Sequence, residues 1–137
     1  MGYDPATRTR TLARLLGPYF LVVAAMFFVR MQALATILPA FMENGALVLV
    51  TGAFTLMLGL LIIGAHHHWT SPPAIAISLI GSAAALKGAW LMIAPELGVE
   101  ATQAFVDAPA AMLAAAAFEL AVGLWLTFVG WFAKPAT

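Results

Sequence analysis

The chain has 137 residues, of which 64% are hydrophobic and only 9% are charged. Soluble domains are about half apolar and about a quarter charged, so this composition excludes an ordinary soluble protein and a disordered one. The net charge is zero and no basic patch is present, which argues against nucleic-acid binding. The chain contains no cysteine, so disulfides and thiolate metal sites are absent.

Four apolar runs predict four transmembrane helices. Runs of about 20 apolar residues cross the hydrocarbon core of a bilayer, and a helix satisfies its own backbone hydrogen bonds there. The predicted spans are 12–29, 45–65, 74–94 and 110–132. We therefore expect an all-α, polytopic membrane protein whose four helices form an up-down bundle in a single domain, residues 1–137.

The first span follows a basic segment and is short. Its apolar core runs only from Leu15 to Val29 and stops at Arg30. The span reaches membrane length when it begins at residue 12, with the Arg14 side chain extending so that its charged end lies among the lipid headgroups. A secretory signal peptide is an alternative, with Ala-Leu-Ala at 33–35 as its cleavage site. Arg30 would then lie in the cleavage region, and the later spans would still make the mature chain a membrane protein.

The segments between the spans differ in character. Residues 31–44 mix apolar and polar side chains around Pro39 and predict a segment that lies along the membrane interface. Residues 65–73, AHHHWTSPP, separate the second span from the third. Residues 95–109 carry three acidic side chains and predict a loop.

Basic residues predict the orientation of the chain. Three arginines precede the first span and Lys134 follows the last, whereas the loops on the other side carry Arg30 as their one basic residue. Because positive charge favours the cytoplasmic side, both termini are expected there, in a bacterial inner membrane. Trp69 and Trp131 are expected to anchor the helices at the membrane–water boundary.

The two halves of the chain align without a gap when the numbering is shifted by 64, as units 17–64 and 81–128. Nine of the positions 40–64 are identical to their counterparts, and the matches Glu43/Asp107 and Gly59/Gly123 weigh most because alanines and leucines coincide easily. We expect two parallel two-helix units, related by an axis along the membrane normal. A generic four-helix bundle with coincident alanines is the alternative.

Lys87 and Glu119 are the charges inside the last two spans. Their distances from the shared outer boundary are about 10 and about 13 Å at the rise of a helix, which predicts an ion pair within the membrane. Under the shift between the halves they correspond to Val23 and Thr55, so the pair belongs to the second half only. It is either a fixed structural pair or a proton- or substrate-linked site.

Three consecutive histidines, residues 66–68, form a second candidate site. Neutral imidazole binds transition metals, haem or bacteriochlorophyll, and in an extended loop His66 and His68 would converge on one ion. The alternative is a solvated cluster whose charge depends on pH. No nucleophile–base set, phosphate loop or nucleotide fingerprint is present, so we expect no catalytic residues, no enzyme activity and no cofactor.

Small residues along the third span predict a helix-packing face. Small side chains let helix backbones approach closely, either within the chain or against another protein. The main functional expectation is therefore an accessory or structural subunit that packs with itself or with a larger membrane complex in the lipid bilayer. A small transporter or proton-coupled carrier that uses Lys87 and Glu119, and a metal- or pigment-binding protein that uses His66 and His68, are the alternatives. The packing residues are Gly81, Ala85, Gly88 and Ala89.

Three segments, LARLLGPYFLVV, GLLIIGAHHHW and ALKGAWLMIAPE, resemble a group of small, uncharacterised four-helix bacterial inner-membrane proteins. In that group a Gly-Pro follows a basic start, one His and a Trp end the second helix, and a Lys-Gly lies in the third. The resemblance singles out Lys87, Gly88, His66 and Trp69, which are the positions that share the group's pattern. The two additional histidines depart from the group's pattern, and the resemblance implies no particular activity.

Overall fold

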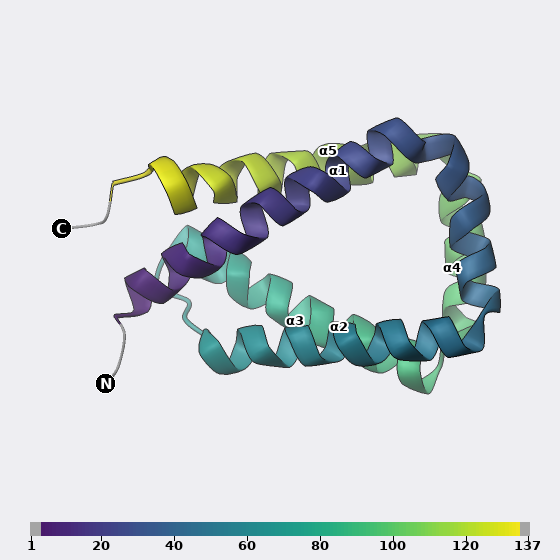
Figure 1. Ribbon diagram of the computed structural model, residues 1–137, viewed down its shortest axis with the longest axis horizontal. Helices are drawn as coiled ribbons and strands as arrows, with labels where there is room; N and C mark the ends of the chain where they lie inside the picture. The colour runs from purple at the N-terminus through teal and green to yellow at the C-terminus, as the bar shows by residue number, and fades with distance from the viewer. Residues whose placement is uncertain (1–3, 135–137) are drawn as a thin grey trace.

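The computed structural model describes residues 4–134, so both ends of the predicted domain lie outside the described part. The elements in order are α1 (Pro5–Glu43), α2 (Gly45–Ala65), α3 (Pro72–Ile93), α4 (Glu96–Val106), α5 (Pro109–Thr127) and a short π-helix, η1 (Phe128–Phe132) (Figure 1). Four helical stretches are long and apolar enough to cross a membrane: α1, α2, α3 and α5 with η1. The prediction of an all-α membrane fold with four spanning helices is confirmed.

Local signals explain where the helices begin. The side chain of Asn44 accepts a hydrogen bond from the backbone N–H of Leu47 at the start of α2. Ser71 does the same for Ala74, and the two prolines that follow it suit the first turn of α3. The third helix therefore starts slightly before the predicted 74–94 span, whereas α2 has the predicted bounds.

The first helix extends beyond its predicted span and bends at Arg30. The backbone of Arg30 is non-helical (φ −114°, ψ 20°), at the position where charge ends the apolar run. The rest of α1, residues 31–43, lies beside α4 (Figure 1). The loop predicted for residues 95–109 is wrong over Glu96–Val106, which forms α4 because its apolar side chains pack against this part of α1.

The four long helices run alternately up and down in two antiparallel pairs, α1 with α5 and α2 with α3 (Figure 1). The pairs converge where α1 begins, where η1 ends and where residues 66–71 connect α2 to α3; we call this the terminal end. They diverge toward the opposite end, the α4 end, which α4 and residues 31–43 of α1 close (Figure 1).

Close packing in both pairs depends on glycines at equivalent positions. A Cβ atom on Gly59 of α2 would collide with the backbone of Ala85 in α3, and one on Gly123 of α5 would come 2.8 Å from the backbone nitrogen of Leu21 in α1. Gly59 is the counterpart of Gly123 under the shift between the halves, and Leu21 is the counterpart of Ala85. The same contact therefore occurs once in each pair.

The breaks between helices follow the same shift. The bend at Arg30 is equivalent to Ala94, the residue that separates α3 from α4. Asn44, which precedes α2, is equivalent to Ala108, which precedes α5. Each half thus has a long helix, a break, a short segment and a second long helix, which supports the predicted repeat of units 17–64 and 81–128.

Two clusters of buried residues hold the described part of the chain together. At the terminal end, Ala13, Ile77 and Leu126 are fully buried and form the centre of a cluster to which all four long helices contribute. At the α4 end, a second cluster joins both parts of α1 to α4 and α5. Its buried members are Leu34, Val106 and Met112, and its partly buried members are Phe27, Met31, Leu38 and Phe105.

Candidate functional site

Lys87 lies in the wall of a cavity of about 410 Å³ near the α4 end. The wall combines residues of α1, α2, α3 and α4, so it is shared by both helix pairs. Three threonine hydroxyls also line it, and aromatic rings make up much of the rest. The threonines are Thr51, Thr55 and Thr102, and the aromatic residues include Phe41, Trp90 and Phe105.

The expected direct ion pair between Lys87 and Glu119 is not formed in this structure. The Oε2 atom of Glu119 is buried and has no hydrogen-bonding partner among residues 4–134. The reason for the separation is the pairing of the helices, since α3 packs along α2 and α5 packs along α1.

The cavity occupies the place that a packed core occupies in the other half of the molecule. The shift between the halves carries the core at the α4 end onto the cavity wall: Leu34 becomes Gly98 and Leu38 becomes Thr102. Phe27 likewise becomes Leu91, which also lines the cavity. Phe27, Leu38 and Phe105 of the core border the same cavity, so the two corners adjoin. The contrast between them rests on Leu34, which is buried in the core, and its counterpart Gly98, which lines the cavity.

Lys87 and the three threonines also lie in this corner, whereas Glu119 stands at the equivalent place of the other corner. Lys87 takes the place of Val23, and the counterpart of Glu119 is Thr55 of the cavity wall. The cavity, the lysine and the threonines therefore occur together in one of two corners that otherwise match. This asymmetry is a feature that helix packing alone does not require.

His66 ties three helices together at the terminal end. Its side chain is completely buried, at 0% exposure. Nε2 lies 2.7 Å from Oγ1 of Thr9 in α1, and Nδ1 lies 3.3 Å from Oγ of Ser78 in α3. The Thr9 hydroxyl also donates to the Pro5 carbonyl at 2.9 Å, so Nε2 donates to Thr9 when it carries the ring proton.

The surroundings of His66 favour its neutral form. Burial, then the nearby positive charge of His68, lower the pKa of His66, and smaller contributions from His67 and Arg8 act in the same direction against a backbone hydrogen bond. The His66 and His68 rings meet edge to face, with centroids 5.1 Å apart.

The metal or pigment hypothesis for His66 and His68 receives no support from this geometry. Both ring nitrogens of His66 already face hydroxyl groups of the protein. Within residues 4–134, no group of three or more His, Cys, Asp or Glu side chains is placed to hold a metal ion.

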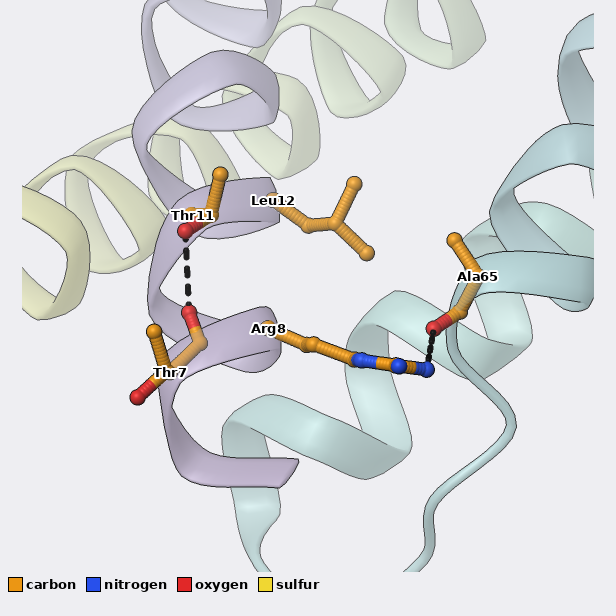
Figure 2. A pocket seen from close by; sticks show the side chains of 5 residues that line it. All are labelled: Thr7, Arg8, Thr11, Leu12 and Ala65. Carbon is orange, nitrogen blue, oxygen red and sulfur yellow. Dashed lines mark hydrogen bonds between the residues drawn. The ribbon is translucent and has the colours of Figure 1, made fainter. Parts of the chain in front are cut away.

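A second cavity, of about 450 Å³, lies beside Arg8 at the terminal end. Figure 2 shows the guanidinium group reaching from α1 to the carbonyl oxygen of Ala65, to which it donates a hydrogen bond of 3.2 Å. Thr7, Thr11 and Leu12 line the α1 side (Figure 2). The arginine thus satisfies a carbonyl at the end of α2 and joins the two helix pairs here.

Two more arginines close the α1–α5 pair. Arg10 and Arg14 both donate to the carbonyl oxygen of Gly130 in η1, at 3.1 and 2.7 Å. Trp131 donates to the Arg14 carbonyl oxygen at 3.3 Å, and the Arg14 guanidinium lies 5.4 Å from its ring centroid. The predicted anchors Trp69 and Trp131 are both more than half exposed, so both rings are free to contact the membrane boundary.

The small residues of α3 pack against α2 of the same chain. Gly81 contacts Ile62, Ala85 contacts Gly59, and Gly88 contacts Leu56. Ala89 is half-buried beside them. The packing face that the sequence predicts is therefore largely covered from within.

Sequence reasoning missed four residues that matter to these sites. Gly98 and Thr102 were detectable, because the shift between the halves sets them against Leu34 and Leu38. Thr9 and Ser78 carried no signal, since their role depends on contacts that only the fold creates. Comparison with protein families, with curated proteins and with solved structures found no match to this chain.

Proposed function

We propose that this protein is a small carrier of the bacterial inner membrane, with cytoplasmic termini, and that it works through the cavity at Lys87. One observation carries the proposal: Lys87 lines a cavity whose wall includes Gly98, at the place where the equivalent half of the molecule has the buried core residue Leu34. A protein that needs only a stable bundle gains nothing from this difference.

The free-energy cost of placing a charge within the membrane supports a functional site at Lys87. A lysine inside a membrane span is costly unless it meets a partner, water or a ligand. A fixed structural pair would hold Lys87 in contact with Glu119, but Oε2 of Glu119 has no hydrogen-bonding partner in the described chain. Lys87 is therefore available to a bound molecule, and Glu119 to a proton.

Glu119 supplies a means of coupling to protons. Oε2 of its carboxyl group is buried and has no hydrogen-bonding partner among residues 4–134. A carboxyl group that is not held in a fixed ion pair can take up and release a proton during a transport cycle without breaking a contact of the folded chain.

The hypothesis of an accessory subunit stays open as the alternative. It rested on the absence of a catalytic set and on small-residue faces of the third and the last predicted helices. α2 covers the face of the third helix at Gly59 and Leu56, whereas alanines of α5 at positions 110, 111, 114 and 117 are exposed. Docking to a larger complex stays a prediction for the remaining lipid-facing surfaces.

Cysteine accessibility tests the carrier function without a known ligand, because the chain has no cysteine. Thr55→Cys places one thiol in the cavity wall, and a membrane-impermeant methanethiosulfonate reagent is added to either side of oriented vesicles. A carrier exposes its site alternately, so modification is expected from both sides. Protection from both sides would contradict the proposal. Thr11→Cys, on the exposed surface of the terminal end, serves as the control for one-sided access.

A further inference from the structure

The residues of the cavity wall indicate which class of ligand the cavity binds. This inference rests on the proposed function. We infer that the ligand is a compact organic monoanion: an aromatic or short branched apolar body that carries one carboxylate, sulfonate or phosphate-like group. The charge of the wall, its apolar lining and the depth of its one cation each point to this class.

The charge of the wall selects a single negative group. Among the described residues, Lys87 is the one charged residue of the wall and no acidic side chain lines it. Thr51 and Thr55 of α2 add hydroxyl donors on the same side of the site. An ammonium group with neighbouring hydroxyls binds an anionic oxygen by charge-assisted hydrogen bonds, which are about twice as strong as neutral ones.

The remainder of the wall suits an apolar body with flat faces. Phe41 comes from the bent end of α1, Trp90 from α3 and Phe105 from α4, so aromatic rings approach from three elements. The volume of about 410 Å³ lies in the range of small-molecule sites. Gly98 and Thr102, which line it, are smaller than their counterparts Leu34, which is buried in the core, and Leu38, which borders the cavity from α1.

The depth of Lys87 excludes a bilayer phospholipid in its usual orientation. Lys87 lies almost two turns before the end of α3 at Ile93, which is about 9 Å along the helix. Phe41 and Phe105 belong to the segments that close the α4 end. The anionic group of the ligand would therefore lie deep and its apolar body nearer the interface, which is the reverse of a membrane lipid.

Equilibrium dialysis of the protein in lipid nanodiscs tests this ligand class with two probes of one shape. 1-Naphthalenesulfonate is a permanent anion and 1-naphthalenemethanol is neutral, and nanodiscs without protein correct for partition into lipid. We expect the sulfonate to bind about tenfold more tightly than the alcohol, because its anionic oxygens pair with Lys87. Lys87→Met should abolish this preference and Lys87→Arg should retain it, whereas Lys134→Met, outside the cavity, should change nothing.

The outcomes separate the ligand class from the carrier function. Equal binding of the two probes, or a preference for the sulfonate that survives Lys87→Met, would overturn the assignment of a monoanion. Absence of binding by both probes, with Thr55→Cys still modified from both sides, would overturn the ligand class and leave the carrier intact. Gly98→Ala combined with Thr102→Leu should reduce binding of both probes, since it fills the cavity; unchanged binding would place the probes elsewhere and overturn the assignment of this site.

Discussion

Leu34 and Gly98 stand at equivalent places in the two halves of the chain, and they have opposite effects on packing. Leu34 is buried in the core at the α4 end, whereas Gly98 borders the cavity that Lys87 lines. One turn later Leu38 and Thr102 are also equivalent, and both border the cavity. The candidate site is thus a corner of the fold from which side-chain volume has been removed and to which a charge has been added.

Filling this corner should stabilise the protein. Gly98→Ala with Thr102→Leu adds apolar atoms to the cavity wall, and the Cβ of residue 98 would displace only the flexible end of Met42, at 2.9 Å. We expect an increase of about 1 kcal/mol in the free energy of unfolding, as cavity filling commonly gives. Thermal unfolding in detergent measures it. A lower melting temperature would show that the corner is already fully packed.

Lys87 and Glu119 should behave as weakly coupled residues. Lys87→Met and Glu119→Leu remove one charge each, and because no direct contact joins these side chains, their effects on stability should add to within about 1 kcal/mol in a double-mutant cycle. A fixed buried pair would instead make each single change costly and the double change much less so. Recovery of stability in the double variant would therefore restore the structural interpretation.

Stability should depend on pH through His66. The pKa of buried His66 is lowered in the folded protein, so the unfolded chain binds the proton more readily. The contribution of His66 to the free energy of unfolding is therefore complete above the ordinary histidine pKa of about 6.5 and is lost as the pH falls below it. Melting temperatures between pH 5 and pH 8 measure the effect. His66→Gln should flatten this pH dependence, and His67→Gln, at an exposed position, should leave it unchanged. The reverse result would contradict the prediction, because it would show that His67 causes the dependence.

The two helix pairs should respond alike to loss of close packing. Gly59→Ala forces a methyl group onto the backbone of Ala85, and Gly123→Ala forces one onto Leu21. Each change should cost about 1–3 kcal/mol by overpacking. Gly64→Ala is the matched control, since a Cβ there meets no atom within 4 Å. A harmless Gly123→Ala beside a costly Gly59→Ala would argue against equivalent pairs.

The spans were predictable because their signal is local. Apolar runs of membrane length mark α2 within its observed bounds and place α3 and α5 to within a few residues, whereas α1 extends beyond both ends of its predicted span. The helix Glu96–Val106 has an amphipathic pattern of its own, but its 11 residues are too short and too polar to register as a membrane span.

The pairing of helices was the main feature that sequence reasoning missed. Lys87 and Glu119 lie on consecutive spans, and the ion pair was expected because consecutive antiparallel helices often pack together. In the structure α3 pairs with the helix before it, and α5 pairs with the first helix of the chain. Chain order alone does not indicate which helices pair. The equivalent glycines Gly59 and Gly123 mark the pairs, because each contacts the backbone of the helix with which its own helix pairs.

The proposed function depends on an open site at Lys87 beside a closed core in the equivalent corner. Gly98→Cys and Leu34→Cys place a thiol at the same position of the two halves, on the cavity wall and in the buried core respectively. Their rates of modification by a membrane-impermeant methanethiosulfonate reagent, measured in the same vesicles, compare the corners directly. We expect rapid modification at residue 98 and protection at residue 34; equal rates at the two positions would contradict the proposal.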